Sequence, residues 1–268
     1  MKRRTFLSAS AAMGMTPVIA MSGLAESSEQ SQPQRLQYFE WIRYHLHVER
    51  NRQRLVSDYY RDVAIPALNK AGINNVGVFN VRHGINDPTL HVIIPHPSLE
   101  SIVTVNDRLI NDQSFVQAGE RVLKTTLSEM AFVSMEKTIM RAFTHLPEIV
   151  VPTQKKENKP RIFQVRTYEA PSLDGLKRKI HMFNEGGEIA IFKKTGLQPV
   201  LFGETIAGDR MPSLVYLLAF DNFDGMSKAW DAFRVDPDWK TLSANKYYDD
   251  TVSRINDWIW APTSFSQI

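Results

Sequence analysis

The chain has 268 residues, 43% of them hydrophobic, with 32 basic and 29 acidic residues and a net charge of +3. It contains no cysteine, which excludes disulfides, thiolate metal sites, a cysteine nucleophile and a lipid anchor on cysteine. The excess of positive charge lies in Lys2, Arg3 and Arg4. Without them, 32 − 3 leaves 29 basic residues against 29 acidic ones. Nucleic-acid binding needs a concentrated basic surface, so no nucleic-acid partner is expected.

The first 25 residues have the three parts of an export signal. Arg3-Arg4 precede Phe6-Leu7, a mildly apolar run of small residues follows, and Gly23-Leu24-Ala25 ends the segment. The run has fewer than about 18 clean apolar residues, so no stable membrane anchor is expected after signal removal. With a polar linker over residues 26–35, the sequence predicts a periplasmic or secreted protein exported by the twin-arginine route.

The remaining chain repeats one order of residues. Three pairs of segments lie 124 residues apart: Ala71–Val76 with Thr195–Val200, Leu90–Ile102 with Leu214–Met226, and Asp112–Phe115 with Asp236–Trp239. The opening strands, Glu40–Tyr44 and Phe163–Thr167, match at 123, which predicts one insertion in the helix between. One register held over four segments indicates an internal duplication.

The second copy shows the elements most clearly in its first part. Ile162–Tyr168 alternates and predicts a strand. Asp174 is the expected cap of a helix whose apolar positions run with period 3.6 as far as Ala190, and Gly196 ends that helix. Leu197–Glu204 is the expected second strand.

The second part of this copy completes the pattern. Ser213–Phe220 is apolar throughout and is the expected central strand. Phe223–Phe233 predicts a helix, and Asp236-Pro237 starts a further helix over Asp238–Ser253 as a cap followed by proline. Arg254–Trp260 is the expected last strand.

The resulting order is β-α-β-β-α-β, the ferredoxin-like arrangement. We therefore expect an α+β fold of two tandem units. Residues 36–149 are the first, degenerate unit and residues 162–268 the second, joined by a Pro- and Lys-containing linker over 150–161.

Aromatic residues near the end of the second copy are expected to pack the core. Trp230 and Phe233 are three apart and share a helix face, and Trp239 starts the next helix as an anchor. In the first copy, the smaller residues Leu109 and Phe115 are expected at the corresponding positions.

These segments carry a family resemblance. FQVRTYEA, KKTGLQPV, VYLLAFDNFDGMSKAWDAFRVDPDW and APTSFS together resemble the NIPSNAP domain family, most closely in the second half. The resemblance implies a dimeric α/β-barrel type of fold, with two ferredoxin-like units packed sheet against sheet as a pseudo-dimer. It implies no single activity, because the family has no agreed reaction and the wider superfamily includes monooxygenases, haem-handling enzymes, isomerases and non-catalytic binders.

Six of the seven histidines lie in the first copy. His45-x-His47-x-Glu49 would place three ligand-type side chains on one strand face, and His91 on the neighbouring third strand could approach His45. Imidazoles with a carboxylate suit Zn, Fe or Ni. The favoured alternative is ordinary hydrogen-bonded histidines at the edge of a cleft, without a metal.

Arg43 and Arg166 are expected at equivalent positions in the opening strands, followed two residues on by His45 and Tyr168. An arginine on a central strand needs a partner, which is either a structural carboxylate or an anionic ligand.

On the helix of the second copy, His181, Glu185 and Glu188 form an i, i+4, i+7 row. The row is either a solvated face or a source of acid–base chemistry. Arg166, Tyr168 and His181 are therefore the catalytic candidates.

Two functions are open at this point. The favoured one is an exported, non-catalytic module that binds a small molecule or a partner in the barrel or a cleft. The alternative is a small α/β-barrel enzyme of the monooxygenase or isomerase kind, cofactor-free or haem-handling. The sequence does not name the ligand or cofactor, and it leaves a homo-oligomer open.

Replacing Arg3 and Arg4 with lysine should hold the precursor in the cytoplasm, because the twin-arginine pathway recognises the arginine pair itself. The variant keeps the positive charge and so isolates that recognition. Cell fractionation measures the outcome, and the mature chain should begin near Glu26. An unchanged periplasmic yield would show that export uses another route.

Overall fold

The computed structural model describes residues 35–83 and 88–268, which belong to one compact unit. The predicted export signal and most of the linker after it lie outside the described residues. None of the helices in the described ranges is long and apolar enough to cross a membrane.

Eight strands form a closed, wholly antiparallel barrel. They are β1 (Tyr38–Leu46), β2 (Gly77–His83), β3 (Thr89–His96), β4 (Phe132–Ala142), β5 (Ile162–Glu169), β6 (Gln198–Ala207), β7 (Ser213–Phe220) and β8 (Arg254–Pro262). Their order around the barrel is β1-β3-β2-β8-β5-β7-β6-β4. The four strands of each half are neighbours, and the halves meet at the pairs β2–β8 and β4–β6. The two expected sheets thus join edge to edge, which leaves no open strand edge.

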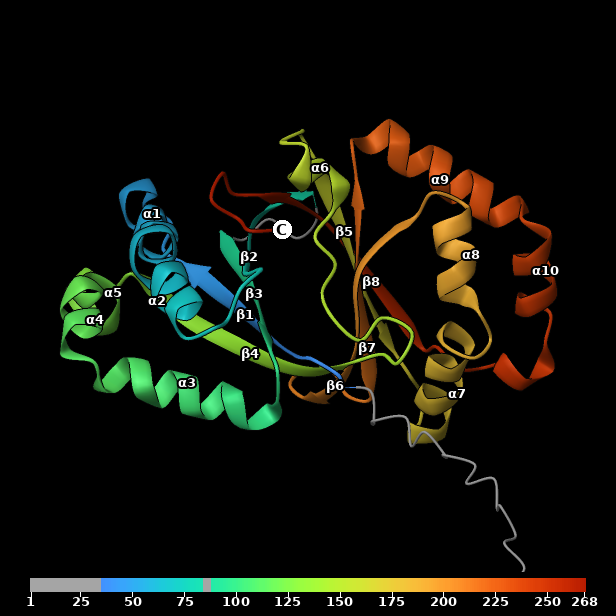
Figure 1. Ribbon diagram of the computed structural model, residues 1–268, viewed down its shortest axis with the longest axis horizontal. Coiled ribbons are helices and arrows are strands. Elements are labelled where there is room, and N and C mark those ends of the chain that lie inside the picture. Colours follow the sequence, from blue (N-terminus) through green and yellow to red (C-terminus); the bar gives the residue numbers. More distant parts are fainter. Residues whose placement is uncertain (1–34, 84–87) are drawn as a thin grey trace, which may run out of the picture. The chain divides into compact units, whose positions relative to one another are not determined.

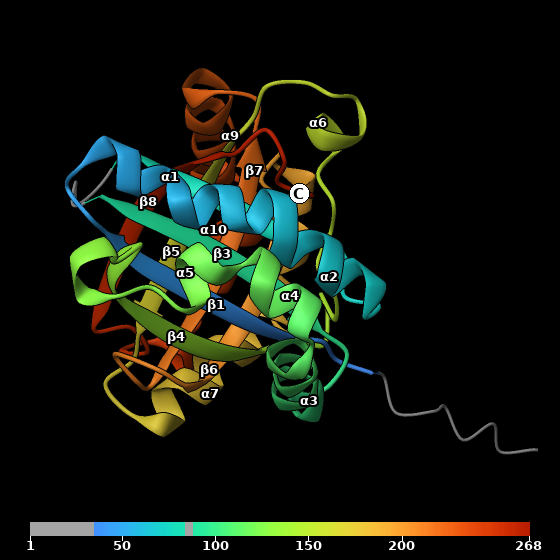
Figure 2. The ribbon, with the colours of Figure 1, turned by 90° about the vertical axis from the view of Figure 1, so that its left-hand side faces the viewer.

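Helices cover the barrel on two sides (Figure 1). The first half supplies α1 (Arg50–Tyr59), the π-helical turn η1 (Tyr60–Ala64), α2 (Ile65–Lys70), α3 (Leu99–Asn111), α4 (Gln113–Ala118), α5 (Glu120–Leu123) and the 3₁₀ turn η2 (Leu127–Glu129). The second supplies α7 (Leu173–Phe183), α8 (Glu188–Lys194), α9 (Phe223–Val235), α10 (Pro237–Ser243) and the 3₁₀ turn η3 (Lys246–Tyr248). Between the halves lies α6 (Thr153–Lys156). Figure 2 shows the helices of the first half lying across their own strands.

Residues 124 apart occupy corresponding positions in the two halves. Tyr44 pairs with Leu90 across β1 and β3, and Tyr168 pairs with Leu214 across β5 and β7. Both partners move by the same amount (168 − 44 = 124 and 214 − 90 = 124). The bounds of α3 and α9 differ by 124 as well. The expected offset of 123 for the opening strands, with an insertion after them, is therefore wrong.

The corrected offset separates the two strand arginines. Arg43 corresponds to Thr167, and Arg166 corresponds to Ile42. Because successive strand residues face opposite sides of a sheet, one position of shift reverses the direction of a side chain. Arg43 shares its side of the wall with the interior residue Trp41, whereas Arg166 shares its side with Tyr168, which packs under the helices.

The interior of the barrel is a packed core built from both halves. Phe39, Trp41, Phe163 and Trp260 are among its buried side chains. The C-terminal residue Ile268 is fully buried in the same cluster. Side chains of the strands therefore fill most of the barrel interior. Space for other roles remains in the helix-covered layers and at one barrel end.

The strands and turns of the second half follow the sequence pattern closely, but two helices differ. The predicted helix to Ala190 breaks after Phe183 and resumes at Glu188, with Gly187 at a φ of 87° between them. Its cap is Ser172, whose side chain accepts from the Gly175 amide, while Asp174 lies in the first turn.

The helix ends near glycine and proline behave as predicted at two places. Gly196 follows α8 with a φ of 88°. Asp236 caps α10, accepting from the amides of Asp238 and Trp239, and Pro237 is the first helical residue. This helix ends at Ser243, however, well before the expected end at Ser253.

The aromatic residues of this region pack as predicted. The ring of Phe233 lies 5.5 Å from Trp230 and 4.4 Å from Trp239, centroid to centroid. Trp230 also contacts Phe192, and its Nε1 donates to Gln164 Oε1 at 2.6 Å. Both tryptophans are half-buried.

Truncating Trp230 to alanine should lower the free energy of unfolding by about 3 kcal/mol, because it removes a large packed ring and leaves Gln164 short of a donor. Urea denaturation measures the change. Phe223→Ala is the matched control on the same helix, since Phe223 is 44% exposed and its loss should cost under about 0.5 kcal/mol. Equal losses for the two variants would contradict the packing role of Trp230.

Candidate functional site

Ionisable side chains gather at one end of the barrel interior, here called the barrel-end site (Arg43, His45, His91 and Glu136). Arg43 Nη1 donates to Glu136 Oε2 at 2.8 Å, and His45 Nε2 lies 3.0 Å from Glu136 Oε1. The Arg43 guanidinium also lies over the ring of Trp41, 5.3 Å from its centroid. The partner of this arginine is therefore a structural carboxylate.

His91 is the buried member of the barrel-end site. Its Nδ1 accepts from Trp41 Nε1 at 3.2 Å, so Nε2 carries the proton and faces Thr89 Oγ1 at 3.3 Å. The ring stacks on Trp260 at 4.4 Å. Burial, followed by the charge of Arg43, lowers the pKa of His91 to about 3. The imidazole is neutral at physiological pH.

The expected row of metal ligands is not formed. β1 ends at Leu46, so His47 lies beyond the strand, where its Nδ1 accepts from the Glu49 amide at 3.2 Å. Glu49 itself stands at the start of α1. The structure does bring His45 and His91 to the same barrel end, on neighbouring strands. Across residues 35–83 and 88–268, no three His, Asp or Glu side chains are placed to hold a metal ion.

The space at the barrel end is small. A cavity of about 40 Å³ lies among Arg43, Glu136, Thr205, Ser213 and Trp258. A water molecule needs roughly 10–15 Å³ of such space, so this cavity has room for a few waters and not for an organic molecule.

The catalytic candidates Arg166 and Tyr168 meet in a second place, here called the closed polar cluster (Arg166, Tyr168, Lys179, Glu188 and Tyr216). It lies between the strands of the second half and α7–α9. Arg166 Nη1 donates to Tyr216 OH at 3.2 Å, and the hydroxyls of Tyr168 and Tyr216 are 3.0 Å apart. Burial raises the pKa of Tyr216 well above its ordinary value. Both phenols are therefore neutral.

A buried ion pair completes the closed polar cluster. Lys179 Nζ lies 2.8 Å from Glu188 Oε2, and both side chains are under 10% exposed. Burial raises the pKa of Glu188 even though the charge of Lys179 opposes that rise. Trp230 lies over the guanidinium of Arg166 at 5.0 Å, and the Lys179 ammonium lies 4.5 Å from the Phe183 ring. Large side chains thus fill this layer.

The third catalytic candidate, His181, is elsewhere. It is exposed, and its Nδ1 lies 2.9 Å from Tyr248 OH. The row with Glu185 and Glu188 does not form, because the helix breaks between His181 and Glu188. Glu185 is exposed whereas Glu188 is buried.

The corresponding layer of the first half is hollow. A cavity of about 240 Å³, here called the inner pocket, lies between its strands and its helices. Tyr44, Tyr59, Tyr60 and Lys137 line it together with apolar side chains from β1, β3 and α2–α5. Sequence reasoning missed this site.

The inner pocket is hollow where its lining residues are smaller than their counterparts in the second half. Six of them replace larger residues that lie 124 positions further on: Ile42 for Arg166, Ala64 for Glu188, Leu68 for Phe192, Asn106 for Trp230, Leu109 for Phe233 and Phe115 for Trp239. In the second half most of these larger residues belong to the closed polar cluster or pack against it. A comparison of side-chain size at this offset is the signal in the sequence that could have located the pocket.

Tyrosine hydroxyls supply the polar groups of the inner pocket. Tyr44 OH and Tyr60 OH are 3.0 Å apart, so the pair keeps one O–H to donate elsewhere. Burial raises the pKa of Tyr44 to about 12 and holds those of Tyr59 and Tyr60 above the ordinary value. Tyr60 begins the π-helical turn η1, a type of irregularity that is frequent at functional sites.

Lys137 at the edge of the inner pocket is held by a buried carboxylate. Glu40 is 1% exposed, forms an ion pair with Lys137 and lies 3.5 Å from His96 Nε2. His96 Nδ1 in turn is 3.1 Å from Ser101 Oγ. Burial acts to raise the pKa of Glu40, but His96 and Lys137 outweigh it, so the pKa is lowered. Glu40 is thus ionised and already partnered.

Comparison with known proteins supports the fold and the domain family. Residues 163–267, in the second half of the chain, match the NIPSNAP family model. An uncharacterized NIPSNAP-like domain protein from Burkholderia xenovorans is 21% identical, covering 40% of this chain and 88% of its own, with a TM-score of 0.36. No curated protein matches the chain.

Two further solved structures cover most of the chain. A proposed monooxygenase from Lactobacillus acidophilus NCFM has a TM-score of 0.54 at 12% identity, over 85% of this chain and 94% of its own. Another from Fusobacterium nucleatum has a TM-score of 0.52 at 9% identity, over 85% and 92%. At these identities the likeness establishes the mixed α/β barrel fold alone.

The buried, neutral His91 should make the protein less stable in acid. The unfolded chain binds a proton near pH 6.5 and the folded chain only near pH 3, so this stability is present above pH 6.5 and is lost as the pH falls. Between pH 7 and pH 5 the contribution is about 2 kcal/mol. Urea denaturation at pH 7 and at pH 5 measures the free energy of unfolding. Its decline between the two pH values should be smaller by about 2 kcal/mol in His91→Gln than in wild type. Parallel declines in wild type and variant would refute the assignment.

Proposed function

We propose that the chain is a non-catalytic binding module whose small-molecule site is the inner pocket of the first half. The observation that carries the proposal is a difference in side-chain size. Six positions of this layer have smaller residues than the corresponding positions of the second half, where the layer is filled. The packing of folded interiors leaves few voids larger than a water molecule, so a hollow of this size calls for an occupant.

The size and lining of the inner pocket limit what it can take. An engineered apolar cavity of about 150 Å³ binds benzene, so about 240 Å³ suits a molecule of one or two fused rings. The apolar walls favour an aromatic or aliphatic body. The hydroxyls of Tyr44 and Tyr60 favour one oxygen acceptor on that body.

The proposal extends to the origin of the two halves and their location. Both have the element order β-α-β-β-α-β and share the 124-residue offset, which supports two tandem ferredoxin-like units that arose by duplication and form a pseudo-dimer. In this view the filled second unit is the structural half and the hollow first unit the binding half. Export by the N-terminal signal would place the module in the periplasm or outside the cell.

An enzyme of the monooxygenase or isomerase kind is the alternative, and the fold likeness to proposed monooxygenases is compatible with it. The chemistry of the inner pocket favours binding over catalysis. Raised pKa values keep its tyrosines protonated near neutral pH, so none is a ready general base. Lys137 is committed to Glu40.

Refilling the pocket with the residues of the second half tests the proposal. We expect wild type to bind 2-naphthol and the double variant Leu68→Phe/Asn106→Trp to lose at least about tenfold in affinity, because the added rings occupy the space of the ligand. Titration calorimetry measures both. Val103→Trp is the matched control: Val103 is 60% exposed on α3, so an indole added there should leave binding unchanged.

A thermal melt of each variant shows that it is folded before it is titrated. Crystals held under xenon provide a second measurement, since xenon enters dry apolar cavities. Equal binding by wild type and the refilled variant, or a wild type that takes up neither 2-naphthol nor xenon, would overturn the proposal.

A further inference from the structure

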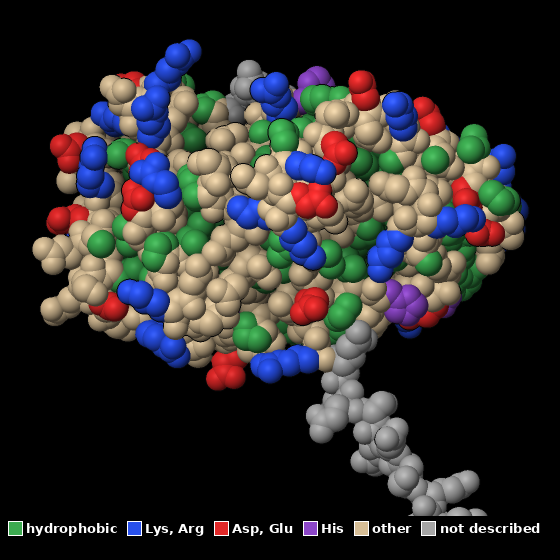
Figure 3. Space-filling model, turned by 45° about the horizontal axis from the view of Figure 1, so that its top comes forward, with side chains coloured by type: hydrophobic (Ala, Val, Ile, Leu, Met, Phe, Trp, Pro, Cys, Tyr) green, Lys and Arg blue, Asp and Glu red, His purple; other side chains and the backbone are tan. Residues whose placement is uncertain are grey.

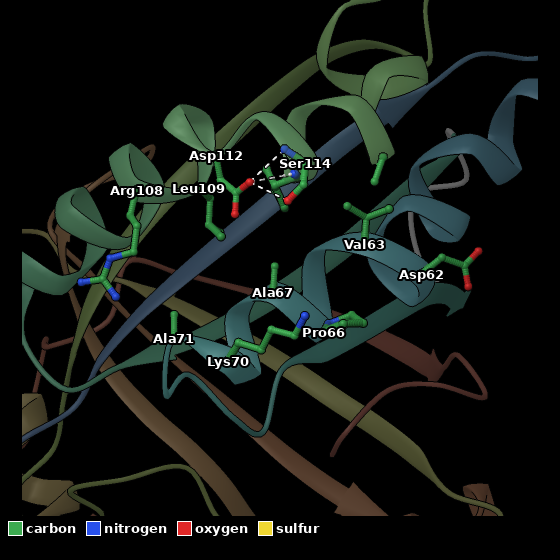
Figure 4. Close-up of a pocket in the computed structure, with 12 residues that line it drawn as sticks. Asp62, Val63, Pro66, Ala67, Lys70, Ala71, Arg108, Leu109, Asp112 and Ser114 are labelled. Atoms are coloured by element: carbon green, nitrogen blue, oxygen red, sulfur yellow. Dashed lines mark hydrogen bonds between the residues drawn. The ribbon is translucent and has the colours of Figure 1, made fainter.

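A second hollow adjoins the inner pocket. The outer groove, with a volume of about 310 Å³, lies between η1 and α2 on one wall and α3 and α4 on the other (Figure 4). Leu109 and Phe115 line both the outer groove and the inner pocket, so the two spaces are neighbours on either side of these side chains. In Figure 4, Leu109 points into the groove from one wall, and Ala67 and Ala71 point into it from the other.

In the second half an ionic clasp joins the two matching helices. Lys194 on α8 lies 2.8 Å from Asp236 Oδ2 and 2.7 Å from Asp238 Oδ2, at the start of α10. The counterparts 124 residues earlier are Lys70, Asp112 and Ser114. The chain therefore keeps the lysine and one acid and loses the other acid.

The first half leaves this clasp open. Lys70 and Asp112 stand on opposite walls of the groove, and no ion pair joins them in the described part of the chain. Asp112 Oδ1 instead caps α4, accepting from the amides of Ser114 and Phe115 and from the Ser114 hydroxyl. Lys70 therefore forms no salt bridge with Asp112, although its charge, after the hydrogen bond from Ser114, helps to lower the pKa of that carboxyl.

The lining of the outer groove holds two acids, Asp62 and Asp112, and two bases, Lys70 and Arg108. Asp62 is held by its neighbour Arg61 through two hydrogen bonds of 2.8 and 2.7 Å. Arg108 is exposed, and neither it nor Lys70 forms a salt bridge with a carboxylate among the described residues. The acids of the lining are thus hydrogen-bonded to near neighbours in the chain, while Lys70 and Arg108 line the groove without a salt bridge.

We propose that the ligand is an amphipathic organic anion, with its ring in the inner pocket and its carboxylate in the outer groove at Lys70 and Arg108. This rests on the proposed function and adds the chemical class of the ligand. An anionic group gains charge-assisted hydrogen bonds from these two side chains, and solvent exposure keeps the gain modest and sensitive to salt.

Two probes of the same shape test the ligand class. Naphthalene-2-acetate should bind wild type about fivefold to tenfold more tightly than naphthalene-2-acetamide at low salt, and 0.5 M sodium chloride should narrow that gap. Lys70→Gln and Arg108→Gln should each reduce the preference for the acetate and leave acetamide binding unchanged. Lys177→Gln, which removes a charge from an exposed position on α7, is the control and should keep the preference.

The outcomes separate the two proposals. Equal affinity for acetate and acetamide in wild type, or an acetate preference that survives in both Lys70→Gln and Arg108→Gln, would overturn the anionic ligand class while the pocket still binds. Binding of neither compound would count against the pocket itself. Loss of acetamide binding in Lys70→Gln would show that Lys70 shapes the pocket and does not select charge.

Discussion

Closure of the barrel is the constraint on which the other features depend. The pairs β2–β8 and β4–β6 join two four-stranded sheets, so each strand has a neighbour on both sides and one face of every strand turns inward. The inward faces meet as a packed core that the C-terminal Ile268 helps to fill. A ligand of one or two rings therefore has to lie outside the barrel interior. On the outer face drawn in Figure 3, acidic and basic side chains are intermixed, without a broad patch of one sign.

The two helix-covered layers use one backbone plan in opposite ways. The second half buries the pair Lys179–Glu188 and stacks aromatic rings around it, although taking two charges out of water opposes folding unless their geometry is good. The first half replaces those groups by small apolar residues, such as Ala64, and avoids that cost. It loses packing in return, because a wall that faces a hollow has no contact atoms there. A bound apolar ring would restore those contacts.

The elements were predictable from the sequence because their signals are local. Alternation indicated the strand at Ile162–Tyr168 and an unbroken apolar run the strand at Ser213–Phe220, while Gly196 and Asp236-Pro237 indicated helix boundaries. The predicted equivalence of Arg43 and Arg166 failed because an error of one residue reverses the face of a strand, and the register is set by long-range pairing. The inner pocket was missed for a different reason. Ionisable residues stand out in a sequence as candidates for function, whereas a hollow forms where side chains are small. Ala64 or Leu68 alone therefore carries no chemical signal.

The direction in which an amphipathic ligand would lie follows from the cost of burying charge. A carboxylate in the inner pocket would meet apolar walls and neutral phenols, since Tyr44 and Tyr60 keep their protons and Lys137 is already paired with Glu40. An ion without a compensating partner loses a large free energy of hydration when it leaves water. Hydrogen bonds from those hydroxyls restore far less free energy than that. In the outer groove the same group stays hydrated and faces Lys70. In the proposal made above, the open clasp and the hollow layer are two parts of one site: the missing rings provide room for an apolar body, and the missing salt bridge leaves Lys70 to meet its charge.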